Sequence, residues 1–181
     1  PINLLYHTGM RIGEVLGLFW DDIDLKKGEI SVSRQYTFIK GKGNVFTQPK
    51  TASSIRKILI DDNMVSLLRR WKVQQNEWEL AAGDSYCIVD EHPDHTAVMY
   101  SKCLSTAETN RKMIVCSGPS GKLVSRATIM QHLRKFGLNA HSFRHTHATV
   151  LIEAGASPKG VAGRLGHKRV DITENLYTHN T

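Results

Sequence analysis

The stretch Ala140–Thr149, which reads AHSFRHTHAT, places three histidines and an arginine within ten residues of a 181-residue chain. On a helix, His141, Arg144 and His145 follow the spacing i, i+3 and i+4, so their side chains share one face. That face becomes apolar from Ala148 onward. The basic groups therefore stand at the N-terminal end of a buried stripe, where the unpaired backbone N–H groups of a helix also favour an anion.

A zinc site is the main alternative interpretation of this stretch. His141 and His145 supply two candidate ligands, but zinc needs at least three from the protein, and no carboxylate or cysteine lies nearby. Arg144 would also place a fixed positive charge beside the metal. A further alternative, in which His145 and His147 only form hydrogen bonds in the core, leaves His141 and Arg144 unexplained. We therefore expect an anion site that holds no metal.

The composition favours one domain with a polyanionic partner. The chain is 40% hydrophobic and carries a formal net charge of +7, and Lys and Arg side chains that neutralise phosphates release condensed counterions. It shows no signal peptide or membrane-length apolar run, and its three cysteines form no recognisable disulfide framework. We expect a soluble cytoplasmic protein. The start, inside an apolar segment and without Met, suggests a piece of a longer chain.

Hydrophobic spacing predicts a mainly α domain with one small sheet. Helices are expected at residues 2–7, 10–19, 61–78, 125–136, 142–154, 157–165 and 171–177. A three-stranded antiparallel meander is expected from residues 29–40, 44–49 and 54–60, with a further short strand at 112–116. The turn-rich segment 81–110 predicts a mobile or variable excursion.

Several polar residues outside the histidine stretch are further candidates for a functional role. Arg11 lies among apolar neighbours in GMRIGEVLGL, where a charge is costly unless it is paired or bound to an anion. A surface pair with Glu14 is one alternative, but the glycines of this segment favour close packing around it. Taken singly, three other residues have ordinary structural interpretations. Lys50 is a loop lysine, His167 a capping histidine and Tyr177 a half-buried tyrosine.

Five segments in order give these residues a common context. TGMRIGEVLGL, PKTASSIRKI, HSFRHTHAT, RLGH and ENLYTH resemble the catalytic domain of the tyrosine site-specific recombinases, the phage integrase family. The resemblance covers nearly the whole chain. It implies that residues 1–181 form a mainly α catalytic domain with a small three-stranded antiparallel sheet (α+β). It also implies that the N-terminal core-DNA-binding domain is absent and the C-terminal tail truncated.

The resemblance also implies a role for each matching residue. Arg11 and Arg144 correspond to the phosphate-clamping arginines, and Glu14 to the acidic partner of the first. The remaining catalytic positions are Lys50, His141, His167 and Tyr177, whereas Arg56 fits the framework without an assigned role. The chain departs from the usual pattern at Phe143 and His147, neither of which is a catalytic position.

The implied reaction is cleavage and rejoining of DNA through a 3′-phosphotyrosine, with no metal, cofactor or ATP. The implied partners are double-stranded recombination sites, three further copies of the full-length protein in a tetramer on DNA, and accessory DNA-bending factors. The expected source is a bacterium, phage or mobile element. Two alternatives stay open: relaxation of DNA by a type IB topoisomerase-like enzyme, and a DNA-binding module without catalysis.

Overall fold

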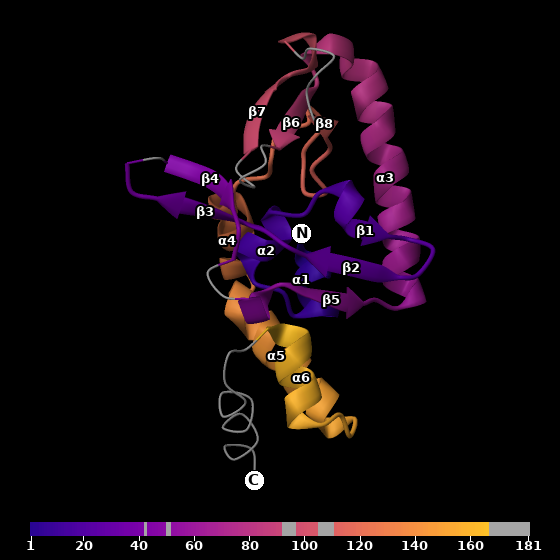
Figure 1. Ribbon diagram of the computed structural model, residues 1–181, viewed down its shortest axis with the longest axis vertical. Coiled ribbons are helices and arrows are strands. Elements are labelled where there is room, and N and C mark those ends of the chain that lie inside the picture. The colour runs from indigo at the N-terminus through magenta and orange to yellow at the C-terminus, as the bar shows by residue number, and fades with distance from the viewer. Residues whose placement is uncertain (42, 50–51, 92–96, 105–110, 167–181) are drawn as a thin grey trace.

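The computed structural model describes residues 1–41, 43–49, 52–91, 97–104 and 111–166 (Figure 1). The α-helices in these ranges are α1 (Ile2–Thr8), α2 (Ile12–Leu16), α3 (Asp62–Ala82), α4 (Arg126–Arg134), α5 (Ala140–Glu153) and α6 (Pro158–Leu165). The strands are β1 (Ile23–Asp24), β2 (Glu29–Val32), β3 (Gln35–Ile39), β4 (Gly43–Thr47), β5 (Arg56–Leu59), β6 (Cys87–Glu91), β7 (Ala97–Ser101) and β8 (Arg111–Lys112). The α+β class is confirmed. None of the described helices is long and apolar enough to cross a membrane.

The predicted three-stranded meander is wrong. Residues 29–40 divide into β2, which pairs with β1 and β5, and β3, which among the described strands pairs only with β4, in a separate hairpin. Arg34 lies between β2 and β3, and its buried guanidinium forms an ion pair with Asp22 and lies 4.3 Å above the centroid of the Phe19 ring. An anchored side chain at this point fixes the backbone between the two strands, and the β3–β4 hairpin projects from the domain (Figure 1).

The described parts of the segment 81–110 contain strands that its turn-rich composition does not predict. They contain the antiparallel pair β6 and β7, and β8 pairs with the other edge of β6. Tyr86 and Val89 are buried, and Val89 belongs to a cluster with Phe19, Phe46 and Ile114. The apolar run CIV at residues 87–89 is too short to predict a strand from the sequence. The residues that pack against Val89 in the core lie far away in the sequence, so the run itself does not reveal them.

Side-chain caps set the starts of the long helices. Asp61 accepts a hydrogen bond from the backbone N–H of Met64 at 2.7 Å and so begins α3, as predicted. Ser157 caps α6, which ends at Gly166 in the left-handed conformation, as expected. Helix α5 begins two residues earlier than predicted because the Asn139 side chain accepts from the N–H groups of His141 and Ser142. His141 therefore lies in the first turn of α5.

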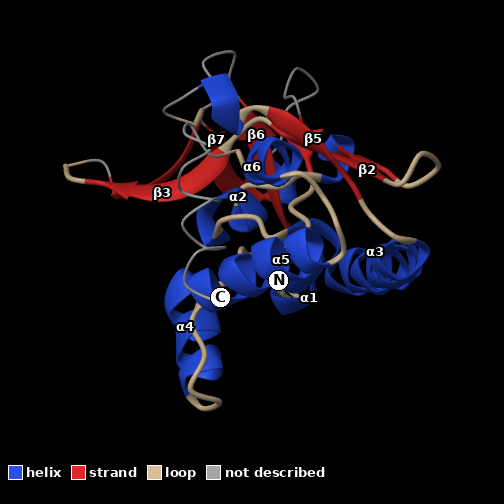
Figure 2. Ribbon diagram, turned by 90° about the horizontal axis from the view of Figure 1, so that it is seen from below, coloured by secondary structure: helices blue, strands red, loops and turns tan. Residues whose placement is uncertain are grey.

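Three helices from opposite ends of the chain meet beside the β1–β2–β5 sheet. Helix α5 packs against α1 and α6, and α6 also packs against β5. In Figure 2, α1, α3, α4 and α5 lie on one side of the molecule and the strands on the other, with α2 and α6 between them. This packing brings the ends of α1 and α6 to the start of α5.

Candidate active site

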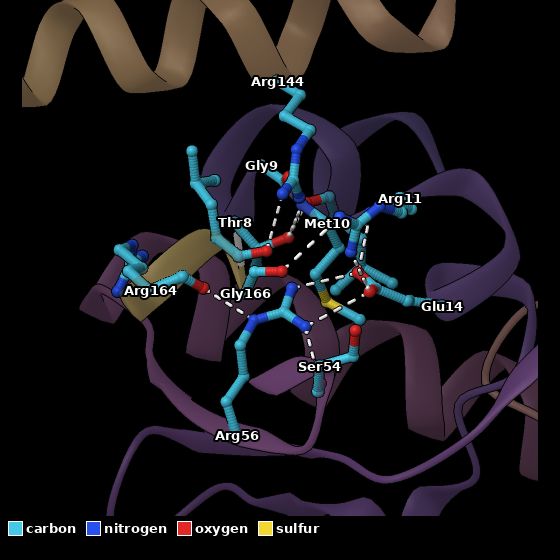
Figure 3. A network of polar contacts seen from close by, with 12 residues as sticks. Thr8, Gly9, Met10, Arg11, Glu14, Ser54, Arg56, Arg144, Arg164 and Gly166 are labelled. Carbon is cyan, nitrogen blue, oxygen red and sulfur yellow. Dashed lines mark hydrogen bonds and ion pairs between the residues drawn. The ribbon is translucent and has the colours of Figure 1, made fainter. Parts of the chain in front are cut away.

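The break between α1 and α2 is shaped by one glycine. Gly9 ends α1 with a φ of 62°, in the left-handed region that favours glycine. A Cβ atom at this position would lie 2.7 Å from the Cδ2 of Leu165 and 2.8 Å from the Cδ2 of His147. The close approach of α5 and α6 thus depends on the missing side chain, and it turns the Gly9 carbonyl toward the guanidinium of Arg144 (Figure 3).

Arg144 is held by backbone carbonyls in the interior of the domain. The residue is 8% exposed, and its guanidinium donates to the Gly9 carbonyl at 2.9 Å and to the Leu165 carbonyl at 2.7 Å. Burial, together with the positive charges of Arg11 and Arg56, lowers the pKa of Arg144 to about 10, whereas the Glu14 carboxylate opposes this shift. The side chain therefore stays charged at neutral pH and is fixed in direction.

Glu14 is a buried carboxylate between two arginines. Its side chain is 2% exposed and accepts from the Arg11 Nη1 at 2.9 Å and from the backbone N–H of Arg11 at 2.8 Å. The Arg56 fork binds both of its oxygens, at 3.2 and 2.9 Å. Burial raises the pKa of Glu14, but the hydrogen bonds and charges of Arg56 and Arg11 outweigh it and lower the pKa overall. The surface-pair alternative for Arg11 and Glu14 is wrong.

Three successive carbonyls at the end of α6 each receive a different arginine (Figure 3). The Arg164 carbonyl accepts from the Arg56 Nε at 2.7 Å, the Leu165 carbonyl from Arg144, and the Gly166 carbonyl from the Arg11 Nη2 in a weaker contact at 3.5 Å. The last carbonyls of a helix lack intrahelical partners and carry negative partial charge, so they suit cations. The C-terminal turn of α6 is therefore the point at which the three guanidiniums converge.

Among the described residues, the cluster carries excess positive charge, and it reaches the surface. Three guanidiniums, those of Arg11, Arg56 and Arg144, lie around Glu14, which is the one carboxylate of this cluster in the described part of the chain, and the Arg11 side chain is 41% exposed. Planar forks that are already oriented suit the oxygens of a phosphate group. The arrangement can bind an anion at the exposed side of Arg11.

The predicted site residues divide between the described and the undescribed parts of the chain. Arg11, Glu14 and Arg144 are brought together, and His141 is exposed in α5 one turn before Arg144. The other three predicted catalytic residues, Lys50, His167 and Tyr177, lie outside the described residues. Among the residues that are described, no three His, Cys, Asp or Glu side chains form a group that could hold a metal; the expectation of a metal-free site stays a prediction.

His147 and Arg164 form a connection that the sequence pattern did not reveal. The Arg164 Nε donates to the His147 Nε2 at 3.1 Å, so the ring proton sits on Nδ1, which lies 3.1 Å from the Tyr6 carbonyl. Arg164 also donates to the Leu59 carbonyl at 2.9 Å. A neutral His147 thus joins α1, α5 and α6. His147 forms the hydrogen bonds of the core alternative but is only half-buried, and the alternative is wrong for His145, which is exposed.

The hydrogen bonds of His147 predict that the folded chain becomes less stable at acid pH. Burial and the charge of Arg164, with smaller effects of His7 and Arg144, lower the pKa of His147 to about 4. The unfolded chain therefore binds this proton first, so the contribution of His147 to stability is complete above about pH 6.5 and is lost as the pH falls toward 4. We expect a loss of about 2 kcal/mol, allowing for partial exposure of the ring, in urea unfolding at pH 4.5 compared with pH 7.

His147→Gln should flatten this pH dependence, because an amide can donate to the Tyr6 carbonyl and accept from Arg164 without titrating. His145→Gln, at an exposed position of the same helix, is the matched control and should keep it. An unchanged slope in His147→Gln would show that another group causes the acid sensitivity.

Comparison with known proteins identifies the family of the chain. The model of the phage integrase family matches residues 2–181. A tyrosine recombinase XerC-like protein of Caldanaerobacter subterraneus subsp. tengcongensis is 36% identical over 97% of this chain. The ICEBs1 integrase of Bacillus subtilis is 33% identical over 98% of it. The chain spans 44% and 43% of the length of these two relatives.

Solved structures show the same fold. The Tn1549 transposon integrase in complex with transposon right end DNA superposes with a TM-score of 0.69 at 23% identity, over 99% of this chain and 53% of its own. The XerA recombinase superposes with a TM-score of 0.62 at 21% identity, over 98% of this chain and 51% of its own. The family match over residues 2–181 and the two similar relatives confirm the resemblance of the five sequence segments, and the chain belongs to the phage integrase family.

Proposed function

We propose that this chain is the catalytic domain of a site-specific DNA recombinase that cleaves and rejoins DNA through a 3′-phosphotyrosine intermediate, integrating or excising a phage or mobile element. The observation that supports this best is the convergence of Arg11 and Arg144 at the end of α6, with Arg11 partly exposed. Family membership supports the reaction type. The DNA complex of the similar Tn1549 integrase supports DNA as the partner.

The arginine cluster suits the transition state of phosphodiester displacement. Negative charge then increases on the equatorial oxygens of the phosphorus, and donors fixed in advance stabilise it without reorganisation. The two carbonyls that hold Arg144 and the carboxylate that holds Arg11 provide such fixation. His141, and His167 by resemblance, supply further N–H donors. Guanidiniums take the electrostatic role that a metal ion has in other phosphoryl-transfer enzymes.

Three residues make the bond changes and proton transfers of the proposed covalent step. The phenol oxygen of Tyr177 attacks the phosphorus and its proton passes to His141, because a phenol, with a usual pKa of about 10, is protonated and weakly nucleophilic at neutral pH. The bond from phosphorus to the 5′-oxygen breaks, and Lys50 protonates that oxygen. Attack by the 5′-hydroxyl of another strand reverses these steps and releases Tyr177. The phosphotyrosine conserves the bond, so ATP is not needed.

The proposed assembly follows from the same function. Exchange between two duplexes needs four active sites, so the full-length protein should act as a homotetramer on two recombination sites, with accessory DNA-bending factors as further partners. The reaction would take place in the cytoplasm of a bacterium that carries the phage or element. The sources of the similar proteins, which include Bacillus subtilis and the Staphylococcus phage L54a, support this location.

A nicked suicide duplex tests the proposal, since loss of the short 5′-hydroxyl fragment prevents rejoining. The duplex is selected from a random-sequence pool by covalent capture on the full-length protein, and is called the capture duplex below. We expect an adduct that forms in EDTA, and strand exchange between two intact sites. Relaxation of supercoils without exchange would support the topoisomerase alternative. Binding without any adduct would support the non-catalytic one.

Lys50→Ala should be rescued by a capture duplex in which sulfur replaces the bridging 5′-oxygen. A thiolate leaves without a proton, so only the oxygen substrate depends on the lysine. We expect slow cleavage of the oxygen duplex and near-normal cleavage of the sulfur duplex in single-turnover gels. Equal slowing on both duplexes would show that Lys50 is not the general acid.

A further inference from the structure

Arg56 lies behind the exposed part of the arginine cluster. It begins β5, and its side chain is 6% exposed, compared with 41% for that of Arg11. Its guanidinium binds Glu14 on one side and the carbonyls of Ser54 and Arg164 on the others. A side chain enclosed in this way acts on a bound phosphate through its neighbours.

The first of these neighbours is the carboxylate that orients Arg11. Glu14 Oε1 accepts from the Nη1 atoms of both Arg11 and Arg56, and Oε2 accepts from the Arg11 backbone N–H and the Arg56 Nη2. The bidentate fork of Arg56 fixes the plane of the carboxylate, and that plane sets the direction of the Arg11 guanidinium. It also adds a second positive charge, so Glu14 neutralises Arg11 only in part.

The second neighbour is the end of α6. The Arg56 Nε donates to the Arg164 carbonyl at 2.7 Å. A Cβ atom on Gly166, whose φ is 70°, would lie 3.0 Å from the Arg56 Nη1. Arg56 therefore packs against the backbone of the same turn whose next two carbonyls, those of Leu165 and Gly166, receive Arg144 and Arg11.

We propose that Arg56 is a positioning residue of the phosphate site: it orients Arg11 through Glu14 and fixes the last turn of α6, against which Arg11 and Arg144 are set. The inference rests on the proposed function of that site. A lysine in its place would keep the charge but provide one point of contact, so it could not hold both Glu14 oxygens and the Arg164 carbonyl together.

Arg56→Lys in the full-length protein tests the effect on the reaction. Loss of the hydrogen bonds that orient Arg11 and fix the end of α6 should weaken transition-state contacts of Arg11 and Arg144, and so slow single-turnover cleavage of the capture duplex about ten- to a hundredfold. Affinity for the duplex should change less than about threefold, because Arg56 does not reach the surface. Arg69→Lys is the matched control: Arg69 lies on α3, bonded to the Leu25 carbonyl, and its rate should stay unchanged. Equal losses of rate and affinity in Arg56→Lys, or no loss, would overturn the inference.

A measurement without DNA separates this inference from the proposed function. In arginine-labelled protein, NMR signals of the Arg11 and Arg144 guanidiniums should shift on addition of inorganic phosphate. Arg56→Lys should move the Arg11 signal before phosphate is added and weaken the response to it, whereas Arg69→Lys should do neither. Arg56→Gln, whose neutral amide cannot donate to both Glu14 oxygens and to the Arg164 carbonyl together, should move the same signal if Arg56→Lys does not fold.

The two hypotheses can therefore fail separately. Failure to capture any duplex, with the Arg11 signal still displaced in Arg56→Lys, would contradict the recombinase function and support the positioning role. Efficient capture, with cleavage and the Arg11 signal both unchanged in Arg56→Lys, would support the recombinase function and overturn the positioning role.

Discussion

Arg144→Lys should slow strand cleavage by about a hundredfold to a thousandfold while lowering affinity for the capture duplex only severalfold. The wild-type guanidinium donates to the Gly9 and Leu165 carbonyls, and these contacts fix the direction of its fork. An ammonium group has no planar fork, so a lysine satisfies the carbonyls or the phosphate but not both in the same geometry. Single-turnover cleavage and equilibrium binding, measured on the same full-length protein, separate the two effects.

The control for Arg144→Lys is Arg69→Lys, which makes the same exchange on the surface of α3. Because Arg144 is 8% exposed, thermal unfolding must show that the variant is folded at the assay temperature. Equal losses of rate and affinity in a folded variant would mean that Arg144 contributes only to binding.

Tyr177→Phe should abolish the covalent protein–DNA complex and leave DNA binding nearly unchanged, because it removes one oxygen atom. The tyrosines in the described part of the chain are poorer nucleophiles or lack the sequence context of ENLYTH. Burial raises the pKa of both Tyr36 and Tyr86, and Tyr86 is only 2% exposed. Tyr6 is 57% exposed, so Tyr6→Phe is the matched control and should form the adduct normally.

The measurement for Tyr177→Phe is the covalent band on a denaturing gel after incubation with the capture duplex. A band that persists in Tyr177→Phe, or disappears in Tyr6→Phe, would overturn the assignment of the nucleophile.

Local sequence signals predicted much of the fold. Asp61, Ser125 and Ser157 mark the starts of α3, α4 and α6, because a short polar side chain can cap a helix through contacts within three residues. Strand pairing was harder, since the break at Arg34 depends on Asp22 and Phe19, which meet it only in the folded chain.

The candidate site likewise combines residues that local motifs reveal with contacts that form only in the folded chain. Arg11, Glu14 and Arg144 were identifiable from motifs, and the structure brings them together. The carbonyls at the end of α6 were not identifiable, because backbone atoms carry no sequence signal. The role of Arg56 was also hidden, although a charged residue in the short strand RKIL was a sign that it needed a buried partner.

The most direct test of the central claim is the chemical identity of the adduct. Full-length protein is trapped on the capture duplex and digested with protease, and the DNA-linked peptide is sequenced by mass spectrometry. The account predicts a peptide containing ENLYTH, linked through Tyr177 to a 3′-phosphate, with a free 5′-hydroxyl on the released fragment. A linkage to another residue, or to a 5′-phosphate, would contradict it.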